Sequence, residues 1–268
     1  MLLLCLAGLT VLAVGLLVRA FSGGETNQSA GDGDGKRPAP VANRHCRAGE
    51  VGLGSRRISV VAFVRTHAGV YQRPGGARLS ILSRLSRSFV STSRRGVPMV
   101  VAALTEVHTS DCQVRWYRVR LSGRPGVSGA REGYVPAGAV ALAEVHTRVL
   151  VDRSRRRLTL YEGGVPVLRA AVAVGAPSTP TPRGSFIVRE RIRITDTSGA
   201  YGAAAIALSG FSEKLIYWPQ GGPIAIHGTN DPGSIGQAAS HGCVRLGARD
   251  LKRLFERVQI GTPVEIIH

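Results

Sequence analysis

Hydrophobic and polar residues alternate over several short stretches of the chain, which is the pattern of β-strands with one buried face. The segment WYRVRL places Tyr117, Val119 and Leu121 on one face and two arginines on the other. RLTLYEGG, residues 157–164, also alternates, and its Gly-Gly turn predicts a hairpin with the following VPVLRAAVAVG. Only ARDLKRLFERVQ, residues 248–259, has the spacing of an amphipathic helix. We therefore expect a mainly β protein with one helix near its C-terminus.

The alternating stretches fall into two blocks. Residues 55–146 contain short strands separated by turns and no convincing helix, which predicts a small β-barrel. Residues 147–268 contain the predicted hairpin, a proline-rich break at PSTPTPRG, and the strand SFIVRERIRI. Alternation in that strand would turn Arg189, Arg191 and Arg193 outward. We predict two β domains with these boundaries.

The N-terminal part differs in composition from both blocks. Residues 1–20 are almost entirely apolar up to Arg19, which predicts a membrane anchor or a signal peptide. No Lys or Arg precedes this run and one follows it, which is opposite to the usual bias for an exported C-terminus. Residues 21–54 are rich in Gly, Pro, Asp and Asn, which predicts a flexible linker. We expect export, with the remainder of the chain outside the cytoplasm.

The chain is strongly basic, with a formal net charge of +18. The positive charge comes from 32 arginines and three lysines that are scattered along the sequence. No stretch that combines aromatic and basic residues accompanies the charge, so we expect no nucleic-acid partner. An exported basic protein would instead be attracted to acidic polymers of the cell surface.

The four cysteines lie in different parts of the chain. Cys5 lies in the apolar N-terminal run, and Cys46 and Cys112 could form a disulfide after export. Cys243 then remains as a lone thiol, which in an exported protein suggests a reactive group.

Cys243 lies in the segment ASHGCVRLG, close to two candidate bases. A cysteine thiol is mostly protonated at neutral pH, so a nucleophilic cysteine needs a base or a positive neighbour. His227 ends the short apolar strand PIAIHG sixteen residues upstream, and His241 is two residues before the cysteine. Gly242 leaves the approach to the thiol open, and the amides of Gly242 and Cys243 could donate to a developing oxyanion. Nucleophile, base and oxyanion donors are thus available within seventeen residues.

Two alternatives compete with the nucleophile. His227, His241 and Cys243 could bind zinc, but His-x-Cys is not a usual ligand spacing and only Asp231 adds another ligand type nearby. We therefore predict no metal and no cofactor. A buried structural cysteine with two hydrogen-bonded histidines is the other alternative.

The segments TPTPRGSF, PIAIHGT and SHGCVRL together resemble the catalytic domain of the YkuD family of L,D-transpeptidases. The resemblance covers about residues 147–268 and implies a YkuD-type β-sandwich. Cys243 would attack the third residue of a peptidoglycan tetrapeptide stem, release the terminal D-Ala and form a thioester. An amine of a neighbouring stem would resolve the thioester and cross-link the two stems. Carbapenems would acylate the same cysteine.

The resemblance also implies roles for neighbouring residues. His227 would take the thiol proton, and Gly228 would orient His227 through its backbone carbonyl. His241, Gly242 and Cys243 would line the oxyanion hole. Four further residues are candidates for binding the stem: Arg245, Ser240, Tyr201 and Trp218. Arg245 could bind a stem carboxylate. The alternative for Ser240 is that it only shapes the turn. Tyr201 and Trp218 flank a segment that resembles a flap over the substrate, and either could instead be a core residue.

The first block resembles a bacterial SH3-like module of the type that accompanies cell-wall enzymes, through WYRV and the following GYVP. Such a module could bind the wall or serve as a spacer. The implied location is outside the cytoplasm, either anchored to the membrane through the N-terminal segment or secreted into the cell wall. Two other functions remain open: an L,D-carboxypeptidase that uses water as acceptor, and a wall-binding protein with a silent catalytic domain.

Overall fold

The computed structural model describes residues 48–89, 96–123, 131–217 and 222–268. The chain divides into two compact units, Met1–Asn43 and Arg44–His268, of which the first lies outside the described residues. The predicted membrane segment, most of the predicted linker, Cys5, Cys46 and Trp218 also lie outside them. None of the described helices is long and apolar enough to cross a membrane.

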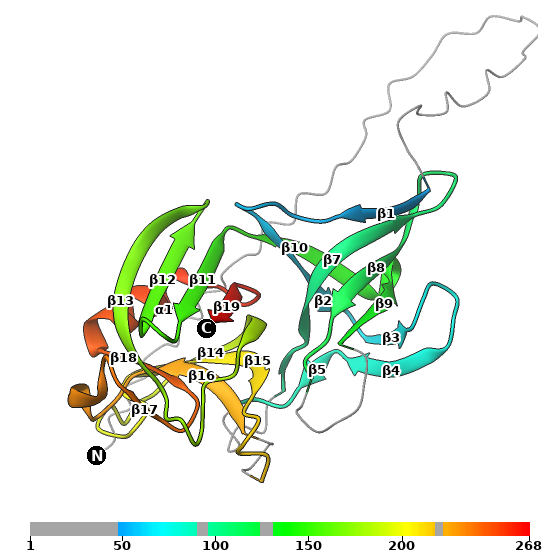
Figure 1. Cartoon of the computed structure of the whole chain (residues 1–268). Helices are drawn as coiled ribbons and strands as arrows, with labels where there is room; N and C mark the ends of the chain where they lie inside the picture. Colours follow the sequence, from blue (N-terminus) through cyan, green and yellow to red (C-terminus); the bar gives the residue numbers. More distant parts are fainter. Residues whose placement is uncertain (1–47, 90–95, 124–130, 218–221) are drawn as a thin grey trace, which may run out of the picture. The chain divides into compact units, whose positions relative to one another are not determined.

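The first half of the described chain forms an antiparallel sheet in the order β10-β2-β7-β8-β9-β3-β4, with β1 on the side of β7 (Figure 1). The alternation in WYRVRL has the predicted effect, since Val119 is fully buried and Tyr117 and Leu121 pack against the same core. The strands are β1 (Gly49–Gly52), β2 (Ser59–Val64), β3 (His67–Tyr71), β4 (Arg78–Ser83), β7 (Val100–His108), β8 (Val114–Arg120), β9 (Glu132–Pro136) and β10 (Val140–Val145).

Strand β1 corrects the N-terminal boundary of this block. Residues 49–52, which composition places in the linker, pair with β7. All four residues are exposed, so they have no apolar pattern that could reveal the strand. Glu50 holds the strand through its side chain, which accepts a 2.9 Å hydrogen bond from the Thr105 hydroxyl and one from the Tyr134 hydroxyl.

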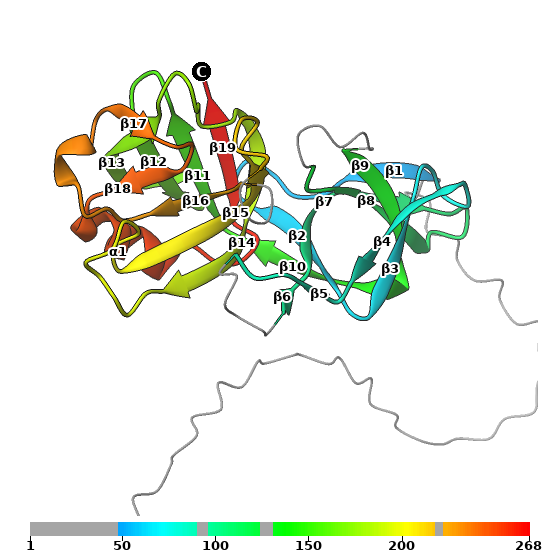
Figure 2. The same cartoon turned by 90° about the horizontal axis from the view of Figure 1, so that it is seen from below.

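The second half forms a nine-stranded sheet in the order β12-β11-β19-β14-β15-β16-β18-β13-β17. β12 also pairs with β13, which closes the sheet into a ring around one core (Figure 2). The predicted hairpin is confirmed as the antiparallel pair β12–β13. The strands are β11 (Thr147–Asp152), β12 (Arg157–Glu162), β13 (Val165–Gly175), β14 (Gly184–Arg193), β15 (Ala204–Phe211), β16 (Pro223–His227), β17 (Ala238–Ser240), β18 (Val244–Leu246) and β19 (Pro263–Ile267).

One α-helix is present in the described part of the chain, α1 (Ala248–Arg257). It buries Leu251, Leu254 and Phe255 against the core of the second sheet, as their spacing predicts. It ends two residues before the predicted boundary because Val258 adopts an extended conformation. The prediction of a mainly β protein with one C-terminal helix is confirmed.

Two further sequence predictions have different outcomes. Cys112 is disulfide-bonded. Its partner lies outside the described residues, so the pairing with Cys46 stays a prediction. The SH3-like character of the first sheet also stays a prediction.

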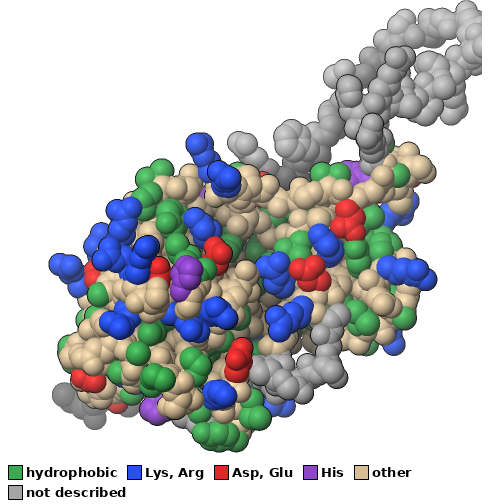
Figure 3. All heavy atoms as spheres, viewed as in Figure 1, with side chains coloured by type: hydrophobic (Ala, Val, Ile, Leu, Met, Phe, Trp, Pro, Cys, Tyr) green, Lys and Arg blue, Asp and Glu red, His purple; other side chains and the backbone are tan. Residues whose placement is uncertain are grey.

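Charged side chains cover the surface in the way that the sequence suggests. Figure 3 shows Lys and Arg side chains spread over the visible face, with fewer acidic side chains between them. Of the three arginines predicted to face outward on β14, Arg191 and Arg193 are exposed. The guanidinium of Arg189 is instead buried at Nε and donates to the Ser86 hydroxyl, so that part of the prediction is wrong. The cause is a break in the strand's alternation that is described below.

Candidate active site

Two short parallel strands bring the predicted nucleophile and base together. β16 and β18 pair so that Ile226 lies opposite Val244 and His227 lies opposite Arg245. Ile226 and Val244 are fully buried in the core of the second sheet. Because side chains alternate along a strand, His227 and Arg245 project from the opposite face. Cys243 directly precedes β18, and the charge of Arg245 lowers the pKa of both Cys243 and His227, which indicates that the three side chains are neighbours. Residues sixteen positions apart in the sequence thereby lie in one region of the domain.

His227 is held in a defined tautomer by the backbone. Its side chain is buried, and Nδ1 lies 2.6 Å from the carbonyl oxygen of Gly228. A carbonyl can only accept a hydrogen bond, so Nδ1 carries the proton and Nε2 is left with its lone pair. Burial lowers the pKa of His227 to about 4, with a contribution from the charge of Arg245, while the bond to Gly228 opposes the change. His227 is therefore neutral near pH 7 and can act as a base.

Cys243 is a free thiol that is partly exposed. Burial raises its pKa, and the backbone amide of Ala225 and the charge of Arg245 lower it to a smaller extent. A raised pKa on the thiol and a lowered pKa on the imidazole favour the neutral pair over a thiolate and an imidazolium. The site thus holds a neutral thiol and a neutral imidazole.

Gly228 and Tyr201 fix His227 from the other side. The Gly228 amide donates to the Tyr201 carbonyl at 2.8 Å, and a Cβ at Gly228 would lie 2.9 Å from that oxygen. The Tyr201 ring packs on the imidazole with centroids 4.6 Å apart. Burial and the nearby Cys243 raise the pKa of the Tyr201 hydroxyl. Tyr201 is 40% exposed and so is not a core residue, and its contact with a substrate stays a prediction.

The loop before Cys243 bears on two predicted roles. The Gly242 amide donates to the Ser240 hydroxyl at 3.1 Å, so it is not aimed at an oxyanion. That hydroxyl in turn donates to the Cys243 carbonyl at 2.5 Å. Ser240 is 2% exposed and its hydroxyl bonds within the loop, which favours the alternative that it shapes the turn over a role in binding substrate. Ser240 instead holds the turn that presents Cys243.

Gly242 still has a structural reason to be glycine. Its φ is +115°, in the range that side chains rarely adopt. His241, next to it, is exposed, and its predicted place in the oxyanion hole stays a prediction.

Arg245 is half-buried, and its charge lowers the pKa of both His227 and Cys243, so it lies near both. Its Nε is buried and has no hydrogen-bond partner among the described residues. A stem carboxylate would have to bind the other guanidinium nitrogens, and this role of Arg245 stays a prediction.

The proline-rich segment 177–183 supports the cysteine loop, a role that its sequence does not reveal. The Thr179 hydroxyl donates to the Ser240 carbonyl at 3.1 Å. The Thr181 hydroxyl accepts from the Gly175 amide at 2.8 Å. A Cβ at Gly175 would lie 2.2 Å from the Thr179 carbonyl oxygen, so the segment requires glycine there. The only sequence signal was the resemblance of TPTPRGSF to the family motif.

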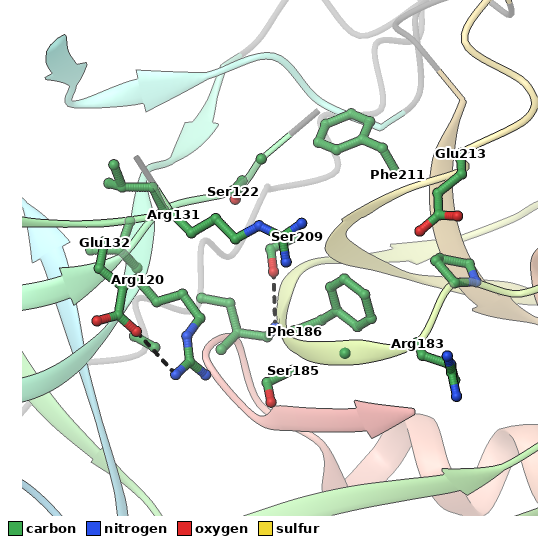
Figure 4. A pocket seen from close by; sticks show the side chains of 17 residues that line it. Arg120, Ser122, Arg131, Glu132, Arg183, Ser185, Phe186, Ser209, Phe211 and Glu213 are labelled. Atoms are coloured by element: carbon green, nitrogen blue, oxygen red, sulfur yellow. Dashed lines mark hydrogen bonds and ion pairs between the residues drawn. The ribbon is translucent and has the colours of Figure 1, made fainter. Parts of the chain in front are cut away.

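Neither a metal cluster nor a large cavity explains this site. Within the described ranges, no group of three or more His, Cys, Asp and Glu side chains could hold a metal ion. A cavity of about 730 Å³ lies elsewhere, between Arg120, Arg131 and Glu132 of the first half and Arg183 and Phe186 of the second (Figure 4). Neither Cys243 nor His227 lines it.

Comparison with known proteins places these residues in a family. Residues 146–266 match the model of the YkuD L,D-transpeptidase catalytic domain. The protein named L,D-transpeptidase YkuD in Bacillus licheniformis is 36% identical over 153 residues, which cover 54% of this chain and 83% of the relative. Its namesake in Bacillus subtilis is 36% identical over 118 residues, which cover 44% of this chain and 64% of the relative.

A solved structure of an L,D-transpeptidase from Mycobacterium tuberculosis aligns with a TM-score of 0.40 and 19% identity. That alignment covers 63% of this chain and 90% of the solved chain. The family assignment rests on the sequence relatives alone. Because residues 146–266 match the family model and the chain covers 83% of a relative that is 36% identical, the chain belongs to the YkuD family of L,D-transpeptidases.

Proposed function

We propose that this chain cross-links peptidoglycan stems by a thioester mechanism centred on Cys243. The observation that carries the proposal is the geometry of His227, whose Nδ1–H is bound to the Gly228 carbonyl, so that its neutral Nε2 keeps a lone pair for a proton. This backbone carbonyl replaces the carboxylate that orients the histidine in Ser-His-Asp triads.

In the first half-reaction, Cys243 Sγ attacks the carbonyl carbon of the third stem residue. Nε2 of His227 takes the thiol proton, which overcomes the raised pKa of the thiol. The backbone amide of Cys243 donates to the oxyanion, since that of Gly242 is bonded to Ser240. The carbon–nitrogen bond to D-Ala then breaks, and His227 returns the proton to the leaving amine.

In the second half-reaction, an amine from a neighbouring stem attacks the thioester. His227 removes a proton from that amine and delivers it to the departing Cys243 sulfur, so the enzyme is restored. Arg245 binds a stem carboxylate, and Tyr201 contacts the stem beside the thiol. Trp218, which lies outside the described residues, stays a candidate for binding the stem.

The function is tested by acylation with a carbapenem, followed by mass spectrometry of the intact protein. Cys243→Ala should form no adduct, and His227→Ala should slow acylation by about a hundred- to ten-thousand-fold, the usual contribution of a general base. His241→Ala is the matched control, because it leaves the backbone amides in place. An adduct on Cys243→Ala, or loss of activity with EDTA, would refute the mechanism.

The acceptor is tested with a purified tetrapeptide stem. A cross-linked dimer supports transpeptidation, whereas release of D-Ala with only a tripeptide product would identify an L,D-carboxypeptidase. Absence of any turnover, together with binding to isolated cell walls, would identify a wall-binding protein.

We also propose that residues 21–268 act outside the cytoplasm, anchored or secreted into the wall, because of the apolar N-terminal run. Protease added to intact protoplasts should digest the C-terminal domain. Complete protection would exclude this location.

A further inference from the structure

The first half of the chain contributes a segment to the surroundings of the catalytic histidine. Residues 86–89 begin at the last residue of β5 (Leu85–Ser86), which pairs with β6 (Val97–Pro98) outside the large sheets. Glu190 of β14 binds this segment with both carboxylate oxygens. One oxygen accepts from the Ser88 hydroxyl at 2.6 Å, and the other accepts from the Phe89 amide at 2.7 Å.

A bulge in β14 makes these two hydrogen bonds possible, and we call them the Glu190 clasp. Val188 lies opposite Leu208 and Glu190 lies opposite Ala207, so Arg189 is an extra residue without a partner on β15. In a regular strand, consecutive side chains point to opposite faces. A bulge re-aims them, and here both Arg189 and Glu190 reach the same segment, Arg189 through the Ser86 hydroxyl.

The clasp places an aromatic side chain next to the active site. The Phe89 ring meets the Tyr201 ring edge-on, with centroids 6.4 Å apart and planes at 84°. Tyr201 in turn packs on the His227 imidazole at 4.6 Å. A continuous aromatic contact therefore runs from the first half of the chain to the base.

We propose that Phe89 is a positioning residue of the transpeptidase site, which holds Tyr201 against His227 and is itself held by the Glu190 clasp. The N-terminal β domain is then part of the working enzyme rather than a spacer. This inference rests on the proposed function for its role in the reaction, and on the contacts above for its physical effect.

The physical effect is on the environment of the imidazole. Without the contact from the edge of the Phe89 ring, the Tyr201 ring is free to move away from the imidazole. Water then reaches the imidazole of His227. The groups that face His227 are Tyr201, the Cys243 thiol and the Arg245 guanidinium, and their charges stay the same. Loss of burial therefore raises the pKa of His227 from its low value toward the ordinary one.

The experiment uses the full chain and measures two quantities: the rate of carbapenem acylation and the pKa of His227 by NMR. Phe89→Leu keeps an apolar side chain but loses the aromatic edge. We expect acylation about threefold to tenfold slower, the range of one aromatic pair, and a higher pKa of His227. Phe89→Tyr should restore both. Ile81→Ala, which removes an exposed side chain of the same domain, is the matched control and should change neither.

Glu190→Ala tests the clasp independently. It should produce the same two changes as Phe89→Leu, and the double variant should be no worse than either single one, because both act through the same ring. If acylation in the double variant were slowed by the product of the two single-variant factors, the proposal would be overturned.

The two measurements also separate this inference from the proposed function. If the wild-type protein is acylated but Phe89→Leu and Glu190→Ala retain its rate and its His227 pKa, the inference alone fails. If the wild-type protein is not acylated, the proposed function fails, and an unchanged His227 pKa in Phe89→Leu would still overturn the contact chain.

Discussion

Acidification should destabilise this protein through His227 in particular. The imidazole has a pKa of about 4 in the folded chain, against an ordinary value of 6.5. Between these values the unfolded chain binds more protons than the folded chain, so stability decreases as the pH falls. The contribution is complete above the unfolded value and is lost progressively as the pH falls toward the folded one.

The size of the effect follows from the difference between the two pKa values. It is about 2.5 pH units, and at about 1.4 kcal/mol per unit it corresponds to about 3 kcal/mol. His227 is only 5% exposed, so solvent screens little of this. A loss of about 3 kcal/mol is a large part of the stability of a typical domain.

Urea unfolding at a series of pH values between 7.5 and about 4 measures this term, with His227→Asn as the reference because it cannot titrate. Carboxylates such as Asp152, whose pKa is lowered by hydrogen bonds from Arg155 and Ser154, also weaken the fold in acid. They do so equally in both proteins, so the difference isolates the histidine. Parallel stability curves for the two proteins would refute the reasoning.

Two further predictions concern the surroundings of the site, and a third concerns the disulfide of Cys112. Ser240→Ala removes two buried hydrogen bonds of the cysteine loop. It should therefore lower the free energy of unfolding by about 1–3 kcal/mol and slow acylation. Ser178→Ala, at an exposed serine, is the control. Gly228→Ala should lower the melting temperature and abolish acylation, because its Cβ would overlap the Tyr201 carbonyl. Gly138→Ala, where a Cβ meets no other atom, should do neither. An active Gly228→Ala would contradict the orienting role of Gly228. Peptide mapping without reductant should link Cys112 to Cys46, and a different partner would end that assignment.

The local patterns of the sequence determined the elements of this fold. The period-two alternation in β8 and in the β12–β13 hairpin predicted both the strands and their buried faces, and the spacing of Leu251, Leu254 and Phe255 predicted α1. These features depend on neighbours along the chain, and the energy of burying one face favours a single assignment. The motif around Cys243 likewise identified the family.

What the sequence could not determine depends on which strands become neighbours. The parallel register of β16 and β18 brings His227 near Cys243, and no pattern within either strand encodes that pairing. The sequence predicted the amide of Gly242 as an oxyanion donor, but in the fold this amide donates to the Ser240 hydroxyl.

The same limit applies to the contact between the two halves of the chain. The alternation of SFIVRERIRI predicted an outward Arg189, but the bulge in β14 turns it and Glu190 onto residues 86–89, about a hundred positions earlier. A strand pattern reports which face is apolar, whereas a bulge and its distant partner are fixed only when the whole sheet is assembled. The sequence alone therefore determined most of the strands and the candidate cysteine, and the tertiary structure decided which residues surround that cysteine and how His227 is held.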